Sequence, residues 1–158
     1  MSQTIKAGSL LQQMQLSGRW ITGHHSSLSA SWAGSSITFE FHGSLLSIDS
    51  GTNTERKDRS STTPMIGLSV GPDELSVFKD PSFMRVLDVI PNETIDILDR
   101  LDGKPSIYFV RIMLIDWAST FELESLTTND VSTPPHHLFN RRIHWDRARQ
   151  YYYHQILR

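Results

Sequence analysis

The sequence contains no cysteine. This absence excludes a disulfide framework, a thiolate zinc site and a cysteine nucleophile, and it leaves the redox compartment open. The sequence also lacks an apolar run of the roughly 18 residues that a membrane-spanning helix needs. The first 18 residues lack the apolar centre of a signal peptide. From the chain as written we therefore expect a cytoplasmic protein with no membrane partner.

Excess positive charge is also missing. Fifteen Lys and Arg residues stand against seventeen Asp and Glu residues, giving a formal net charge of -2. A domain that binds nucleic acid usually carries a net positive charge. The C-terminal tail does mix Arg with Trp and Tyr, a combination that suits phosphates and bases, but Asp146 interrupts it and no nucleic-acid motif is present. We therefore expect no nucleic-acid partner.

The clearest pattern is alternation with a period of two. Between Ser36 and Ser50, Ile37, Phe39 and Phe41 alternate with polar residues, and Leu46 and Ile48 do the same after a turn at Gly43. Alternation of this kind predicts two half-buried strands, which we interpret as a consecutive antiparallel hairpin.

Further short apolar runs follow, separated by turn residues and by a polar loop from Thr52 to Pro64. The predicted strands are Met65–Val70, Leu75–Phe78, Met84–Ile90, Thr94–Leu98, Ser106–Ile115 and one that includes Phe121 and Leu123. Ser106–Ile115 is apolar on both faces, which favours a central strand over the alternative of a buried helix. Together these runs predict an all-β fold, a two-sheet jelly-roll or β-sandwich of about eight strands.

The length of 158 residues fits one domain. We divide the chain into an N-terminal extension at 1–17, a β-sandwich domain at 18–130 and a C-terminal tail at 131–158. Pro134 and Pro135 end the strand pattern. After Arg141 the apolar residues have mixed spacings of three to five, which permits a short C-terminal helix.

The segment from Trp32 to Leu45 reads W-A-G-S-S-I-T-F-E-F-H-G-S-L. It resembles the W-x-G-S-x-I-x-F-x-F-x-G-S-x-L signature of the N-terminal jelly-roll domain of carbohydrate esterase family 2 and related SGNH (GDSL-type) esterases. The resemblance extends over roughly Gly18 to Thr128, with the first block as its most specific part. It implies a β-sandwich that precedes a separate catalytic domain.

In that family the catalytic serine lies in a Gly-Asp-Ser block of the other domain, and this sequence has no such block. The nearest string, Ile48-Asp49-Ser50-Gly51, lies in the predicted hairpin and not at a strand-to-helix elbow. We therefore expect no catalytic residue in this chain, while the family itself is a hydrolase. The resemblance implies a non-catalytic accessory domain whose partner is an SGNH catalytic domain or a glycan. The alternative is a stand-alone β-sandwich that binds glycans or proteins.

Three residues are candidate ligand contacts. Trp117 follows the predicted central strand in a loop, where an exposed Trp is costly unless it packs back or meets a ligand. Trp32 and His24 are weaker candidates, and both tryptophans have the alternative of packing against the core. The adjacent pairs His24-His25 and His136-His137 lack the spacing and carboxylate support of a metal site, so we expect neither a metal nor a cofactor.

Overall fold

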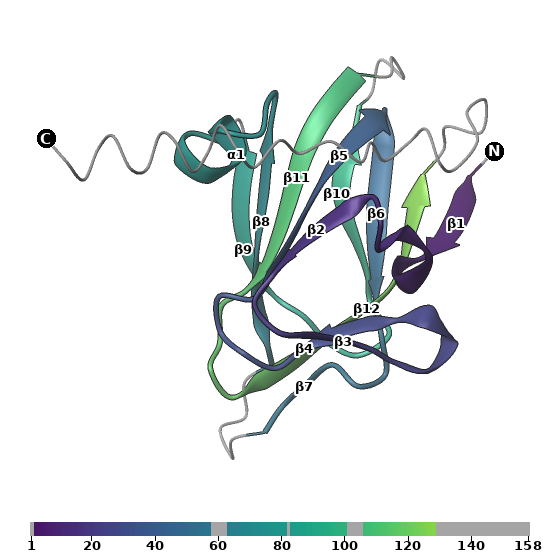
Figure 1. The fold of residues 1–158 in the computed structure, drawn as a ribbon, viewed down its shortest axis with the longest axis vertical. Helices are drawn as coiled ribbons and strands as arrows, with labels where there is room; N and C mark the ends of the chain where they lie inside the picture. Colours follow the sequence, from purple (N-terminus) through teal and green to yellow (C-terminus); the bar gives the residue numbers. More distant parts are fainter. Residues whose placement is uncertain (1, 58–62, 82, 101–105, 129–158) are drawn as a thin grey trace, which may run out of the picture.

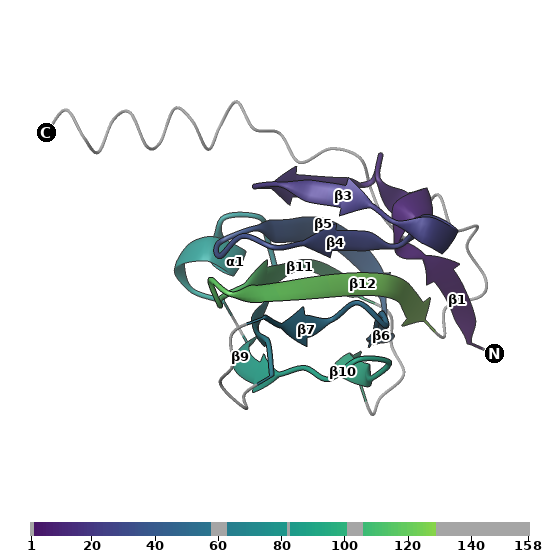
Figure 2. The same cartoon turned by 90° about the horizontal axis from the view of Figure 1, so that it is seen from below.

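The computed structural model describes residues 2–57, 63–81, 83–100 and 106–128. Over these residues the chain forms two antiparallel sheets that pack face to face (Figures 1 and 2). The predicted all-β sandwich is confirmed. The predicted C-terminal helix, with the rest of the tail, lies outside the described residues. None of the described helices is long and apolar enough to cross a membrane.

We name the two sheets A and B. Sheet A has the order β10 (Thr94–Asp99), β6 (Leu45–Ser50), β12 (Ser119–Thr128), β4 (Leu28–Ala30) and β3 (Trp20–Thr22), with β1 (Gln3–Lys6) and β7 (Glu55–Arg56) also paired to β12. Sheet B has the order β2 (Met14–Ser17), β5 (Ser36–Gly43), β11 (Ser106–Leu114), β8 (Met65–Gly71) and β9 (Phe83–Asp88). Three one-turn helices complete the described fold: η1 (Ala7–Leu10), η2 (His24–Ser26) and α1 (Ser76–Lys79).

The predicted hairpin at 36–50 is wrong in its pairing, although both strands exist. β5 pairs with β2 and β11 in sheet B, while β6 pairs with β10 and β12 in sheet A. The turn between them therefore crosses from one sheet to the other. Both strands direct their apolar side chains into the space between the sheets. Each strand nevertheless forms its backbone hydrogen bonds in a different sheet. Gly43 is needed there because the Phe41 ring occupies the place of a Cβ atom.

The strand predicted at Ser106–Ile115 is central, as expected, and lies between β5 and β8 in sheet B. Val110, Ile112 and Leu114 on its inner face are fully buried. The opposite face carries Phe109 and Met113, which are half-buried. This second apolar face explains why the sequence of the strand is apolar on both sides. It faces outward from sheet B.

The strand predicted at Leu75–Phe78 is wrong, because residues 76–79 form the short helix α1. The Asp73 carboxylate accepts a hydrogen bond from the Ser76 backbone N–H at 2.8 Å, and the Ser76 hydroxyl donates to the Asp73 carbonyl at 2.9 Å. These local bonds favour a helical turn over an extended strand. Four residues were too few for periodicity to decide between the two.

The segment that we described as an N-terminal extension contributes a strand to each sheet. β1 pairs with β12 in the register Gln3 to Thr128, and β2 pairs with β5 in the register Met14 to Phe39. Ala7 and Leu10 of the connecting helix are buried in the common core. The sandwich therefore begins before Gly18.

The core lies between the sheets. Its largest fully buried side chains come from both sheets: Phe39, Phe41, Ile37, Ile66, Leu68, Ile112 and Leu114 from sheet B, and Phe121, Leu28, Leu46 and Ile48 from sheet A. Burial on this scale supplies the main stabilising free energy of the domain.

Candidate ligand-binding site

Two loops lie together at one end of the sandwich, at the lower left of Figure 1. The first joins β4 to β5 and the second joins β11 to β12. The Gly34 N–H donates to the Leu114 carbonyl at 2.7 Å, and the Leu114 N–H donates to the Ser35 carbonyl at 2.9 Å. The hydroxyls of Ser31 and Thr120 are 3.0 Å apart. We call this end, residues 31–35 and 115–118, the loop end.

Each of the two loops exposes a tryptophan. Trp32 is 64% exposed and Trp117 is 78% exposed. Neither side chain is folded into the core, so the structure excludes the alternative reading that both are packed aromatics. Exposed indole rings at one place on a domain suit a ligand with flat apolar faces, because the ring offers a large apolar surface and a hydrogen-bond donor.

The turn that presents Trp32 has a defined geometry. The Ser35 N–H donates to the Trp32 carbonyl at 3.0 Å, and Gly34 has a φ of +84°, in the left-handed region. A positive φ at the third position of a turn favours glycine. This explains why the W-x-G-S block matters locally: Gly34 makes the turn and Ser35, which is buried, joins it to β5.

Asp116 holds the second loop. One of its carboxylate oxygens accepts hydrogen bonds from the Met65 N–H at 2.7 Å, the Ser119 hydroxyl at 3.3 Å and Arg56 Nη1 at 3.5 Å. The side chains of Arg56 and Asp116 are only 18% and 11% exposed. Because Asp116 precedes Trp117 directly, these bonds fix the backbone that carries the indole. Sequence reasoning named this loop but did not foresee the anchoring role of Asp116.

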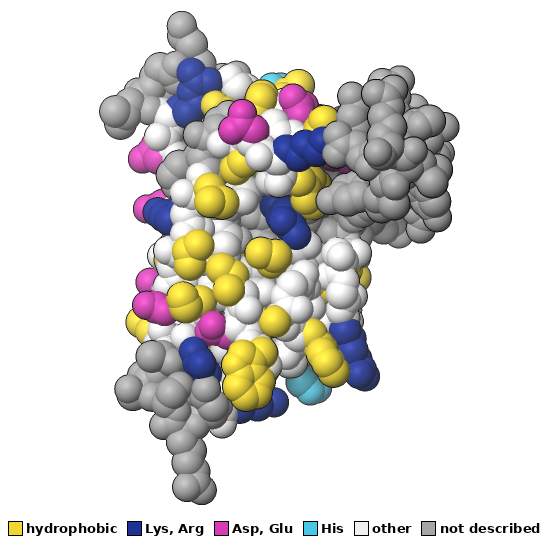
Figure 3. Space-filling view, turned by 90° about the vertical axis from the view of Figure 1, so that its left-hand side faces the viewer, with side chains coloured by type: hydrophobic (Ala, Val, Ile, Leu, Met, Phe, Trp, Pro, Cys, Tyr) yellow, Lys and Arg dark blue, Asp and Glu magenta, His cyan; other side chains and the backbone are white. Residues whose placement is uncertain are grey.

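Hydrophobic side chains also extend away from the loop end. Figure 3 looks onto the outer face of sheet B, with α1 at the top and the loop end at the bottom, and yellow side chains are spread along it. Ile115, beside Trp117, is 37% exposed. The tryptophans are thus one end of a longer, partly apolar surface.

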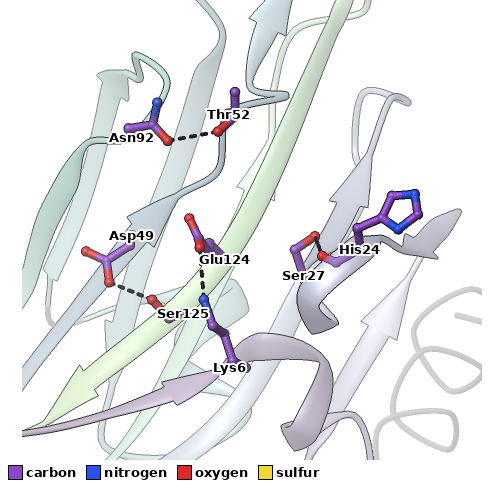
Figure 4. A network of polar contacts seen from close by, with 8 residues as sticks. All are labelled: Lys6, His24, Ser27, Asp49, Thr52, Asn92, Glu124 and Ser125. Atoms are coloured by element: carbon purple, nitrogen blue, oxygen red, sulfur yellow. Dashed lines mark hydrogen bonds and ion pairs between the residues drawn. The ribbon is translucent and has the colours of Figure 1, made fainter.

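The structure does not bring His24 to the tryptophans. His24 lies in η2, at the closed end of the β3–β4 hairpin, where the Gly23 N–H donates to the Ser27 carbonyl. Trp32 follows the other end of β4. Figure 4 shows the His24 imidazole directed away from the surrounding polar contacts. Within the described residues, no three metal-ligating side chains gather into a group that would hold a metal ion.

Other polar groups near this region serve the sheets. The Asp49 carboxylate accepts hydrogen bonds from the Ser125 and Thr94 hydroxyls, both at 2.6 Å, and Lys6 pairs with Glu124 at 2.9 Å (Figure 4). These contacts join neighbouring strands of sheet A. The oxygen and nitrogen atoms of these side chains are therefore engaged in contacts within sheet A.

Ser50 has a structural role in the turn between β9 and β10. Its hydroxyl donates to the Ile90 carbonyl at 2.6 Å and accepts from the Glu93 N–H at 2.8 Å. The residue is 1% exposed. A serine nucleophile needs an accessible hydroxyl beside a general base, and Ser50 has neither among its hydrogen-bond partners.

Comparison with known proteins adds one finding to this geometry. No protein-family model and no curated protein matches the sequence. The structure is similar to a family two carbohydrate esterase from Cellvibrio japonicus, with a TM-score of 0.60, 16% identity and coverage of 81% of this chain and 33% of that chain. The similarity shows that this chain shares the β-sandwich fold of the matched part of that esterase.

Two further solved structures contain a domain with a similar fold. One is a two-domain esterase active on acetylated mannans, with a TM-score of 0.56, 18% identity and coverage of 80% of this chain and 36% of the esterase. The other is a family two carbohydrate esterase from Clostridium thermocellum in complex with cellohexaose, with a TM-score of 0.50, 11% identity and coverage of 72% and 30%. This chain thus spans about a third of the length of the esterases it matches. The matched part is their N-terminal module, outside the catalytic part.

Proposed function

We propose that this chain acts as a non-catalytic accessory domain of an SGNH-type carbohydrate esterase. The observation that carries the proposal is the uneven coverage of the structural match. About four fifths of this chain is similar to one third of the Cellvibrio japonicus esterase, and that third is the N-terminal module. A fold alone does not assign an activity, so the chemistry has to be argued from the residues.

The residues support a role without catalysis. Serine-type ester hydrolysis needs an accessible nucleophile, a base within hydrogen-bond reach and preorganised oxyanion donors at one rigid site. The sequence has no Gly-Asp-Ser block. The Asp-Ser pair that it does contain ends in Ser50, whose hydroxyl is buried and bonded to backbone groups.

An esterase assay tests this proposal. The isolated chain would be incubated with an aryl acetate and with acetylated xylan, and in parallel with a fluorescent serine-reactive phosphonate. We expect neither hydrolysis above background nor labelling. The complete Cellvibrio japonicus esterase serves as the positive control. Turnover together with covalent labelling of a serine in this chain would overturn the proposal.

The gene region offers an independent test. An accessory domain of this kind has its catalytic partner in the same gene or in a neighbouring one. We expect a Gly-Asp-Ser block near this reading frame, in frame or displaced by a frameshift. If the flanking sequence encodes no SGNH-type domain, the accessory role is wrong.

A second candidate function is the binding of a glycan by the domain itself. The specific observation in its favour is the pair of exposed tryptophans on two loops that hydrogen bonds hold together. Aromatic rings stack on the apolar faces of sugars through the same dispersion and hydrophobic contacts that pack protein cores. In this reading Trp32 and Trp117 are the contact residues, and His24 is a separate candidate at the other end of β4.

Affinity electrophoresis tests the second candidate. The chain would be run in native gels that contain soluble xylan, glucomannan or hydroxyethylcellulose, beside Trp32→Ala and Trp117→Ala variants. Retardation by at least one polymer, reduced in both variants, is the expected result. Leu75→Ala is the matched control, because Leu75 is also an exposed apolar residue but precedes α1 at the opposite end of the sandwich. Equal retardation of all four proteins would exclude the loop end as the binding site.

A further inference from the structure

The outer face of sheet B contains a cation that has no anionic partner among the residues that the structure describes. Arg111 lies on the central strand β11 and is half-buried. Within the described part of the chain no carboxylate forms an ion pair with it, and its Nε atom is buried without a hydrogen bond. Burial lowers the pKa of its guanidinium below the usual value. A buried charge is normally paired, so a half-buried charge left unpaired at a surface suggests that its partner comes from outside the described fold.

The surroundings of Arg111 hold the guanidinium in place. Its central carbon lies 4.6 Å from the centre of the Phe78 ring, a cation–π distance. Its Nη2 atom points at the Met113 sulfur at 3.5 Å, which is a weak acceptor. Neither contact neutralises the charge. The guanidinium is therefore oriented but still able to donate strong hydrogen bonds.

Short side chains flank this part of β11. Arg111 is paired in register with Ser69 of β8 and Thr38 of β5, and Met113 is paired with Gly67 and Ser36. The side chains of β11 therefore stand above their neighbours. Ser69 and Thr38 carry hydroxyl groups on either side of the cation, of which Ser69 is half-buried and Thr38 is only 3% exposed. Glu40, two residues beyond Thr38 on β5, makes no ion pair with Arg111.

This row continues to the loop end. From Arg111 toward the loop end, the outward residues of β11 are Arg111 and Met113, the exposed Ile115 comes next, and Trp117 follows in the loop. At about 3.3 Å per residue, the four steps from Arg111 to Ile115 span roughly 13 Å. One face of the molecule thus combines an indole ring, an apolar strip and a guanidinium that has no anionic partner among the described residues.

We propose that the outer face of sheet B, from Trp117 to Arg111, binds an acidic glycan and that Arg111 pairs with the carboxylate of a uronic acid unit. This inference rests on the glycan-binding candidate above and adds the charge of the ligand. A guanidinium matches the geometry of a carboxylate through two parallel hydrogen bonds. A polysaccharide that carries uronic acid supplies both the flat sugar faces for the indole and the anion for Arg111.

The test compares a charged polymer with its neutral form. The chain would be run in native gels with glucuronoxylan and with the same polymer after chemical reduction of its carboxyl groups. Dissociation constants follow from retardation at several polymer concentrations. We expect the wild-type chain to bind the charged form about tenfold more tightly, the size of effect that charge-assisted hydrogen bonds produce.

Two substitutions connect that difference to Arg111. Arg111→Gln is expected to bind both polymers equally, at the affinity that the wild-type chain has for the reduced form. Arg111→Lys keeps the charge but loses the paired geometry, and should retain only part of the preference. Lys6→Gln is the matched control: it removes one positive charge from sheet A and should leave the preference intact. Urea unfolding verifies that each variant is folded.

The outcomes separate this inference from the one on which it rests. If the wild-type chain binds both polymers equally, or if Arg111→Gln keeps the preference for the charged form, Arg111 is not a uronate site while glycan binding stands. If the wild-type chain binds neither polymer, nor the neutral polymers tested above, glycan binding itself is wrong. In that case the unpaired cation is either solvated or reserved for a carboxylate on a protein partner, and the proposal falls with it.

Discussion

Replacing Phe39 with alanine tests whether the space between the sheets is the stabilising core. Phe39 lies in the middle of β5, is fully buried, and faces Met14 and Val110 in register. Truncation to alanine removes about 150 Å² of buried apolar surface, which at about 25 cal/mol per Å² corresponds to roughly 4 kcal/mol. The cavity left behind brings the upper estimate to about 5 kcal/mol.

Urea unfolding followed by circular dichroism measures this loss. With a urea dependence of about 2 kcal/mol per M, the transition midpoint should fall by roughly 2 M. If Phe39→Ala does not fold, Phe39→Leu keeps most of the volume and should cost about 1 kcal/mol. Phe78→Ala is the matched control, because the same truncation occurs at a ring that is 47% exposed. Equal losses for Phe39→Ala and Phe78→Ala, or a loss below about 1 kcal/mol at Phe39, would refute the assignment of the core.

Four other substitutions have expected outcomes. Asp116→Ala removes the shared acceptor of three donors and should cost about 2–3 kcal/mol in urea unfolding, whereas a loss under about 0.5 kcal/mol would show that the loop is not anchored there. Ser50→Ala should cost about 1–2 kcal/mol and leave phosphonate labelling at background, and labelling of the wild-type chain that this substitution abolishes would contradict its structural role. Trp32→Ala, at an exposed ring, should change the free energy of unfolding by less than about 0.5 kcal/mol; a larger loss would mean that the ring packs against the domain. Arg111→Met should be neutral or raise it by up to about 1 kcal/mol, since an unpaired half-buried charge is replaced by an apolar chain, and a clear loss would indicate that an internal partner exists.

Strand positions were predictable from the sequence because alternation reports which side chains are buried. The inner residues Ile37, Phe39, Phe41, Leu46 and Ile48 are all fully buried, as their spacing predicts. Pairing was not predictable in the same way. Two consecutive strands with buried faces look alike in sequence whether they form a hairpin or cross between sheets, so only the structure reveals that β5 and β6 have different partners.

Short elements were the other source of error. α1 depends on hydrogen bonds between Asp73 and Ser76, which four residues of apolar pattern do not reveal. β1 and β2 have four residues each, and they were not recognised because an edge strand needs little apolar content of its own. Their place in the sheets follows from partners far away in sequence.

The candidate site was predictable only in part. Trp117 was identified from its place in a loop, and its side chain is exposed there, while its contact with a ligand stays a prediction. His24 was named on residue type alone and lies elsewhere in the fold. Arg111 was not recognised, because its position on an alternating strand shows only that it faces outward. Its lack of a carboxylate partner within the described fold depends on what β5, β8 and α1 place around it, which no local pattern contains.

The way in which β12 connects the sandwich has a consequence for how the chain folds during synthesis. β12 pairs with β1, β4, β6 and β7, so four strands find a partner in the last strand of the described fold. The contact of Thr4 with Thr127 spans 123 positions. Until Ser119–Thr128 has left the ribosome, sheet A lacks the strand that joins its parts, and its apolar inner face has no stable arrangement. Pairing over such long separations is slow, on a scale of about milliseconds to seconds. The nascent chain therefore exposes unpaired strand edges until a late stage, when chaperones are most useful to it.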